Sequence, residues 1–284
     1  MSTSTLSPSA KRKPRRRLPL AAVIGLTIVV FWLTMALFGP YLAVHDVGGV
    51  TGDDVFAPMS AAHPLGTDYL GRDMLSRILH GAPYTIGVAL AAVVVASFGG
   101  TALALFAAAA GGWFDAIVSR IVDVKLSIPS KLLALIIIAA FGSSIPVLIL
   151  TAGIGYIAGA YRIARSLAVN VQAMDYVQAA RARGEGLIYI TFFEMLPNMF
   201  RPVLADFGLR FVFIVLMLSG MSFLGLGVQP PEADWGSLVR ENIIGLSEGA
   251  PAVIVPAIAI ATLTIGVNMV IDSLAGRKRR GSGD

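Results

Sequence analysis

Cysteine is absent from this sequence, and charged residues are scarce. Without cysteine, the chain can form no disulfide bond, no thiolate metal site and no cysteine nucleophile. Charged side chains make up only 14% of its 284 residues, against about a quarter in ordinary soluble domains, while apolar side chains make up 56%. This balance excludes a soluble enzyme and predicts a protein that crosses a membrane several times.

The motifs that carry phosphate or hydrolytic chemistry are also absent. None of the lysines follows a glycine, so the sequence has no G-x-x-x-x-G-K-[ST] phosphate-binding loop and no ATPase site of that kind. It contains no H-E-x-x-H helix and no G-x-S-x-G elbow. We therefore assign no catalytic residue, cofactor or metal to this chain, and a membrane enzyme stays only as a residual alternative.

Long windows without charge predict where the chain crosses the membrane. A helix needs about 20 mainly apolar residues to span the hydrocarbon core. Residues 18–38 form such a window, and because they are too long for a signal peptide and lack a clear cleavage site, we expect them to remain as a helix. A second helix is expected near 83–110, with Pro83 in its first turn and Gly111 just past its end.

The window at 132–161 allows two interpretations. It is either one long helix or the main part of two helices, the first beginning near Ile117, with a break at 142–146. The windows at 211–231 and 249–271 predict the last two helices. The choice at the third window decides on which side of the membrane the following arginine-rich segment lies.

The distribution of arginine and lysine favours the two-helix interpretation, because short cytoplasmic loops collect basic residues. With two helices, the basic tails at 1–17 and 274–284 and the segment 162–210 all lie on the cytoplasmic side. More than half of the 17 acidic residues fall in the predicted outer loops, 39–80 and 229–248. We therefore predict an all-α polytopic membrane protein with six spans and both termini inside. The net charge of +5 then reflects orientation in the membrane and requires no nucleic-acid partner.

The charged residues near the spans do not form a relay across the membrane. They lie toward the predicted inner ends of the helices, where they can pair or reach the interface, so structural pairing is preferred over a substrate role. These residues are Asp123, Lys125, Lys131, Asp206, Arg210 and Asp272.

A short amphipathic helix is predicted near 172–184, in the long cytoplasmic segment. Tyr176, Val177 and Ala180 fall on one face at helical spacing, and Gly184 stands where a left-handed cap would end the helix. Small side chains such as Ala179 and Ala180 would let a groove of a partner protein approach closely. The alternative is an interfacial helix that lies on lipid headgroups. The opposite side carries Asp175, Gln178 and Arg181.

This segment resembles the EAA coupling motif in permease subunits of bacterial ABC importers. In that family the motif forms the cytoplasmic helix that fits a cleft on the ATPase subunit. Gln178 stands where the family usually has glutamate. The resemblance implies an ATPase-coupling role for Asp175, Tyr176, Val177, Gln178, Ala179, Ala180, Arg181, Gly184 and Pro197.

Two further segments narrow the resemblance to the C-type permeases of dipeptide, oligopeptide and nickel importers. One is 222–231, followed by Asp234-Trp235-Gly236. The other lies before the second helix. Its histidine and two aspartates could suggest a metal site, but hydrogen bonds that hold the loop over the second helix are the preferred explanation. Its matching residues are His63, Pro64, Gly66, Thr67, Asp68, Gly71, Arg72 and Asp73.

The resemblance extends from about residue 18 to 276 and implies a type I ABC importer permease fold. Residues 18–80 would form the first helix and an extracytoplasmic loop, and 82–273 the transmembrane domain. The implied partners are a second, B-type permease, two ATPase subunits that bind ATP and Mg, and an extracytoplasmic substrate-binding protein. The implied location is the bacterial inner membrane.

The expected substrate is a di- or oligopeptide, delivered by the binding protein. The same architecture would serve nickel chelates or another small solute, which stays as an alternative. A stand-alone, ion-coupled secondary transporter is the alternative from another class. We find no convincing internal repeat of the kind such carriers commonly contain, and six spans is few for one.

Overall fold

The computed structural model describes residues 19–49 and 55–276, so nearly all of the predicted basic tails lies outside the described residues. Within these ranges every regular element is a helix. The long helices are α1 (Leu20–Leu42), α2 (Met74–Ala110), α3 (Gly112–Ser127), α4 (Ser130–Phe141), α5 (Ile145–Gln172), α8 (Leu196–Phe223) and α10 (Pro251–Gly276). The short ones are α6 (Asp175–Ala182), α7 (Leu187–Tyr189), the π-helical turn η1 (Ile190–Met195), α9 (Trp235–Glu241) and η2 (Ile243–Leu246).

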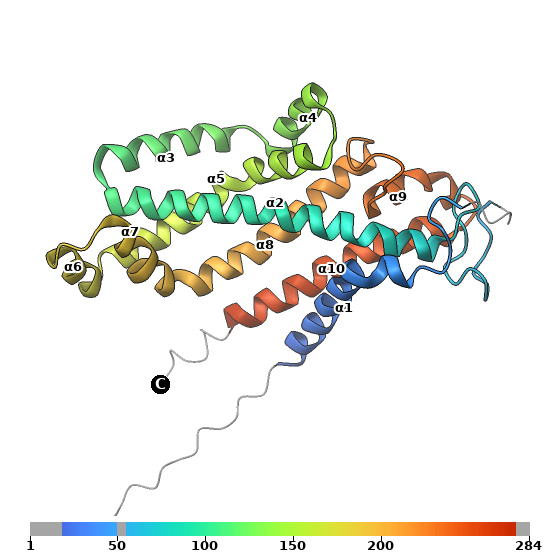
Figure 1. The fold of residues 1–284 in the computed structure, drawn as a ribbon, viewed down its shortest axis with the longest axis horizontal. Coiled ribbons are helices and arrows are strands. Elements are labelled where there is room, and N and C mark those ends of the chain that lie inside the picture. The colour runs from blue at the N-terminus through green and yellow to red at the C-terminus, as the bar shows by residue number, and fades with distance from the viewer. Residues whose placement is uncertain (1–18, 50–54, 277–284) are drawn as a thin grey trace, which may run out of the picture.

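The long helices lie side by side and give the molecule two distinct ends (Figure 1). Helices α2, α5 and α8 pack together through the middle, and α1 pairs with α10 along one side. Residues 43–49 and 55–73 and helix α9 gather at one end, which we call the loop end. Helices α6 and α7 lie at the other, which we call the α6 end. A change at α6 can therefore reach the loop end only along the long helices.

Five helices are long and apolar enough to cross a membrane, and α3 and α4 supply a sixth span only if they are counted together. The two are bent by 82° at their junction, so the single third helix expected from Ile117 is wrong. The cause is Pro129, because its ring disfavours helical geometry at the residue before it, and Ile128 is extended with ψ 118°. The predicted break at 142–146 is confirmed, since α4 ends at Phe141 and α5 begins at Ile145.

Two predicted helix boundaries are corrected by the structure. Helix α2 begins at Met74 instead of near Pro83, because the Asp73 side chain caps it by accepting a hydrogen bond from the backbone N–H of Ser76 at 2.8 Å. Helix α8 begins at Leu196 and ends at Phe223, so both its start and its end come earlier in the chain than those of the predicted span 211–231. Asp206 and Arg210, which bounded the charge-free window, pair inside α8, so the helix continues through them.

Helices α2 and α5 approach closely through small residues. A Cβ atom added at Gly100 would lie 2.6 Å from the Ala160 Cβ and 2.7 Å from the Ile157 carbonyl oxygen. A Cβ atom at Gly153 would lie 2.7 Å from a methyl group of Val95. Small side chains at such contacts let helix backbones pack tightly where burial of apolar surface is no driving force. The α2–α5 pair is thus a rigid connection between the two ends.

Candidate functional site

Helix α6 forms where the amphipathic pattern predicts it. Val177 and Ala180 are fully buried, in the same apolar cluster as Ile190 and Met195 of η1. Gly184 follows with φ +78°, the left-handed conformation that favours glycine, and the chain turns back there. The predicted cap is therefore confirmed, and α6 is seated against the body of the protein by two side chains one helical turn apart.

The outward face of α6 is mainly polar and small, but Tyr176, expected on the apolar face, is also 38% exposed. Asp175, Gln178, Ala179 and Arg181 are exposed, whereas Ala180 has no exposed surface. Of the two alanines expected to admit a partner, only Ala179 is exposed. Ala180 lies against this chain and is closed to any other protein.

Two hydrogen bonds tie α6 to the long helices. Arg181 donates from Nη2 to the carbonyl oxygen of Ala109, at the end of α2, at 2.7 Å. Gln178 donates from Nε2 to the carbonyl oxygen of Gln172, the last residue of α5, at 2.8 Å. A glutamate at position 178 could not donate this second bond, since a carboxylate only accepts. The amide therefore has a defined structural use here, and a displacement of α6 pulls on both α2 and α5.

The remaining predicted coupling residue, Pro197, lies in the first turn of α8. A proline is favoured there because its missing N–H has no partner inside a helix in any case. Its exposed ring follows η1, the turn on which α6 packs. Helix α6 and the start of α8 therefore form one contiguous part of the α6 end.

At the loop end, residues of the motif at 63–73 take part in a buried ionic network. Asp68 has no exposed surface and accepts hydrogen bonds from Arg72 Nε and Arg77 Nη1, each at 2.7 Å. Arg77 also donates from Nη1 to Glu241 of α9 at 2.8 Å, and Arg72 donates to the same carboxylate at 3.4 Å. Two carboxylates thus balance two guanidinium groups, as burial of charge requires.

Glu241 is a residue of this network that the sequence reasoning missed. It lies 164 positions after Arg77, and no local pattern connects the two. The same network engages Asp68 with two arginines, so Asp68 is not available for the metal site considered with His63 and Asp73. The preferred explanation, hydrogen bonds that hold the loop over α2, agrees with this geometry.

The other residues of the motif shape the loop. Gly66 and Gly71 have φ values of +74° and +73°, and a Cβ atom at Gly66 would lie 2.5 Å from the Ala57 carbonyl oxygen. The Thr67 hydroxyl accepts a hydrogen bond from the backbone N–H of Ala57 at 2.7 Å. Pro64 is exposed on the turn that leads into them. The loop is therefore built around tight turns that close over buried polar groups.

Asp73 connects the loop to the first turn of α2. Its Oδ1 lies 2.9 Å from His63 Nδ1, and its Oδ2 caps the helix at Ser76. Burial alone would raise the pKa of Asp73, but the hydrogen bonds from His63 and Ser76 outweigh it and hold the pKa below its usual value. Asp73 is thus ionised and engaged on both of its oxygens.

The motif at 222–236 anchors α9 to α2 and α8. Asp234 and Ser237 form a capping box at the start of α9, and Asp234 also accepts a hydrogen bond from the Ser222 hydroxyl of α8. Trp235 donates from its indole nitrogen to the Ile78 carbonyl oxygen at 3.0 Å and from its backbone N–H to Thr85 Oγ1 at 2.9 Å. Burial raises the pKa of Asp234.

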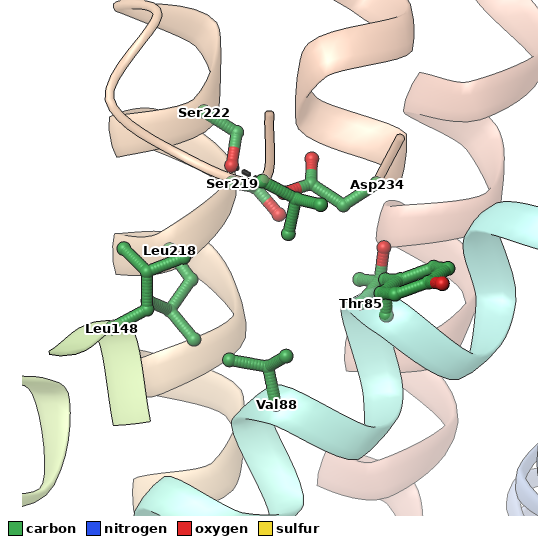
Figure 2. A pocket seen from close by; sticks show the side chains of 9 residues that line it. Thr85, Val88, Leu148, Leu218, Ser219, Ser222 and Asp234 are labelled. Carbon is green, nitrogen blue, oxygen red and sulfur yellow. Dashed lines mark hydrogen bonds between the residues drawn. The ribbon is translucent and has the colours of Figure 1, made fainter. Parts of the chain in front are cut away.

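A small cavity lies beside this junction. Figure 2 shows Asp234 and Ser222 joined by their hydrogen bond on one side of it, with Thr85 and Val88 of α2 opposite Leu148 and Leu218. The cavity is lined by residues from α2, α5 and α8, the three central helices. Motif residues at the loop end thus reach the centre of the bundle.

Of the six charged residues expected to pair near the spans, Asp206 and Arg210 form an ion pair inside α8. Arg210 is bonded to Asp206, one turn earlier in α8, by two hydrogen bonds of 2.6 and 2.9 Å, and it also donates to the Tyr156 carbonyl oxygen. Lys125 donates to the carbonyl oxygen of Gly155. Because Asp206 and Arg210 neutralise each other, α8 continues through them as one helix.

Comparison with known proteins places these features in a wider context. Residues 100–280 match the protein family described as "Binding-protein-dependent transport system inner membrane component". A dipeptide transport system permease protein, DppC, from Alkalihalophilus pseudofirmus is 32% identical over 253 residues, covering 89% of this chain and 83% of that protein.

Two other relatives match over similar lengths. A probable D,D-dipeptide transport system permease protein, DdpC, from Escherichia coli is 34% identical over 89% of this chain and 85% of its own length. A glutathione transport system permease protein, GsiD, from Pectobacterium atrosepticum is 30% identical over 90% of this chain and 85% of its own length. The matches therefore extend beyond the family region and take in most of the loop end.

Proposed function

Because this chain belongs to the family of binding-protein-dependent transport system inner membrane components, we propose that it is the permease subunit of an ATP-driven importer and forms half of the path for peptides. The names of its relatives support a peptide substrate, since they refer to dipeptides, D,D-dipeptides and glutathione. The chain has no phosphate-binding loop of its own, so ATP and Mg would be bound by partner ATPase subunits.

The observation that carries this proposal is the construction of α6. Two of the three residues of its apolar side, Val177 and Ala180, are buried within the chain, whereas Tyr176 is 38% exposed, and its polar side is exposed around Ala179. A helix that only lay on lipid headgroups would direct its apolar side to the membrane. An exposed small and polar face that is firmly backed by the protein suits a cleft on another protein.

The hydrogen bonds that attach α6 to the long helices would couple ATP hydrolysis to transport. Closure of the ATPase subunits would move α6, and its bonds to Ala109 and Gln172 would pass the movement to α2 and α5. The tight α2–α5 contact at Gly100 would keep these helices together while α3, α4 and α8 rearrange around them. The result is a two-state switch between inward-open and outward-open packing.

The orientation follows from the same assignment. The α6 end would face the cytoplasm, and the loop end would face outward, where the binding protein delivers the substrate. Both termini would lie inside, with α3 and α4 together counted as one of six spans. A second, homologous permease would complete the translocation path.

The test is a bulky substitution on the exposed face of α6. We expect Ala179→Trp to abolish co-purification of the ATPase subunits and to lower ATP-dependent peptide uptake at least tenfold, because tryptophan would fill the space that the cleft occupies. Ala61→Trp, on an exposed position of the loop end, is the matched control and should retain the ATPase subunits. Full ATPase binding and uptake by Ala179→Trp would contradict the docking role of α6.

A further inference from the structure

Three metal-ligand side chains converge at the loop end, apart from the ionic network of Asp68. His45 follows α1 by three residues, His63 lies in the long loop, and Asp73 stands directly before α2. One ligand atom from each lies within 4.8 Å of the other two. Three separate segments of the chain thus bring two imidazoles and one carboxylate to a single point.

The separations between these atoms match those of a metal site. His63 Nδ1 lies 2.9 Å from Asp73 Oδ1, and His45 Nδ1 lies 3.8 Å from Asp73 Oδ2. The two histidine rings have centroids 4.9 Å apart. In a tetrahedral site with bonds of about 2.0–2.1 Å, neighbouring ligand atoms lie roughly 3.3 Å apart. The two measured distances involve different oxygens of Asp73 and lie on either side of this value, so a bound ion would replace the hydrogen bond between His63 and Asp73.

The second histidine has no other evident use. Within the described part of the chain, His45 Nδ1 is buried and makes no hydrogen bond, although it is directed at a carboxylate. A buried polar atom in this position calls for an explanation, because such groups are normally satisfied. A cation held between the two histidines and Asp73 supplies the missing partner.

We propose that His45, His63 and Asp73 bind one divalent late-transition-metal ion, of which zinc is the type. Imidazole nitrogens with a carboxylate suit zinc and its first-row neighbours, whereas magnesium and calcium prefer oxygen ligands. The side chain of His45 is 31% exposed, so water can complete the fourth position from that side. The site is independent of the transport assignment, since it rests only on the geometry of these three residues.

The surroundings orient the proposed ligands. Asp73 already accepts a hydrogen bond from the Ser76 backbone N–H, and a carboxylate has enough lone pairs to keep this cap while it binds a cation. The backbone N–H of His45 donates to Ser76 Oγ at 3.3 Å, which holds the histidine near the start of α2. Such supporting bonds are typical of metal sites. The ion would fasten the end of α1, the loop and α2 together.

The proposal is simple to test because the sequence contains only three histidines, of which His80 lies outside the cluster and serves as a control. His80 lies in α2, where its Nδ1 is bonded to the Ser76 carbonyl oxygen, outside the cluster. The full chain, purified in detergent without a histidine tag, is titrated with zinc in competition with a chromophoric chelator. Cobalt gives a second readout, since a tetrahedral nitrogen and oxygen site produces a visible absorption band.

We expect one zinc ion per chain in the unmodified protein and the same affinity in His80→Ala. His45→Ala should weaken zinc binding at least tenfold and remove the cobalt band. Because His45 is partly exposed, this variant should fold even if His63→Ala does not. The proposal is overturned if the unmodified chain shows no saturable binding, if His45→Ala binds zinc as the unmodified chain does, or if His80→Ala weakens binding equally.

Discussion

Arg77 is the residue on which the charge balance of the loop end depends most. Its guanidinium lies between Asp68 and Glu241, and its side chain is only 4% exposed. Removing one member of a buried ionic group leaves the remaining charges without compensation and without water. The arrangement also joins the loop and the start of α2 to Glu241, 164 positions later, so Arg77 has a structural role that its position in α2 alone does not reveal.

We therefore expect Arg77→Ala to lower the free energy of unfolding by about 3–5 kcal/mol. The exposed Arg201 of α8 provides the control, since substitutions at such surface positions change stability by about 0.5 kcal/mol or less. Denaturation of the two variants in the same detergent measures the difference. Equal stability of Arg77→Ala and Arg201→Ala would show that the network contributes little to the fold.

Residue-level prediction from the sequence succeeded where the signal was local and failed where it was not. The cap at Gly184, which follows from glycine's freedom at positive φ, is confirmed, and helical spacing correctly predicts the burial of Val177 and Ala180 but not the exposure of Tyr176. The pairing of Arg77 with Glu241 and the approach of His45 to Asp73 arise from tertiary packing. No spacing rule within one segment could have revealed them.

At the scale of elements, glycine and proline decide where helices end, and paired charges decide where they continue. The break between α4 and α5 was predictable because Gly142 and Pro146 mark it in the sequence. The start of α8 was misplaced because the search for charge-free windows excluded charged residues that pair inside the protein, and the start of α2 because Pro83 lies inside the helix instead of in its first turn. Arg210, bonded to Asp206, is the example in α8.

The close contact of α2 with α5 predicts a position-dependent effect of adding one methyl group. Gly100→Ala should destabilise the protein by about 1–3 kcal/mol, because the new Cβ meets Ala160 and backbone atoms of α5. Gly87→Ala, in the same helix, meets no atom within 4 Å and should be neutral or mildly stabilising. Thermal unfolding in detergent distinguishes the two. Equal effects at both positions would contradict tight α2–α5 packing.

For the whole molecule, the absence of cysteine allows the proposed orientation to be mapped directly. Single cysteines at Gln178 in α6 and Ala61 in the loop occupy exposed positions at opposite ends. In intact cells, we expect a thiol reagent that cannot cross the inner membrane to label Ala61→Cys and to label Gln178→Cys only after the membrane is opened. Labelling in the reverse order would overturn the orientation with both termini inside.

In the proposed role, this chain transports only as a subunit coupled to ATP hydrolysis. The most direct measurement is uptake of a labelled dipeptide into proteoliposomes that contain either the complete complex or this chain alone. We predict uptake by the complete complex only when ATP and the binding protein are present, and none by the chain alone under an ion gradient. Gradient-driven uptake by the purified chain without ATP would contradict the account and identify a secondary transporter instead.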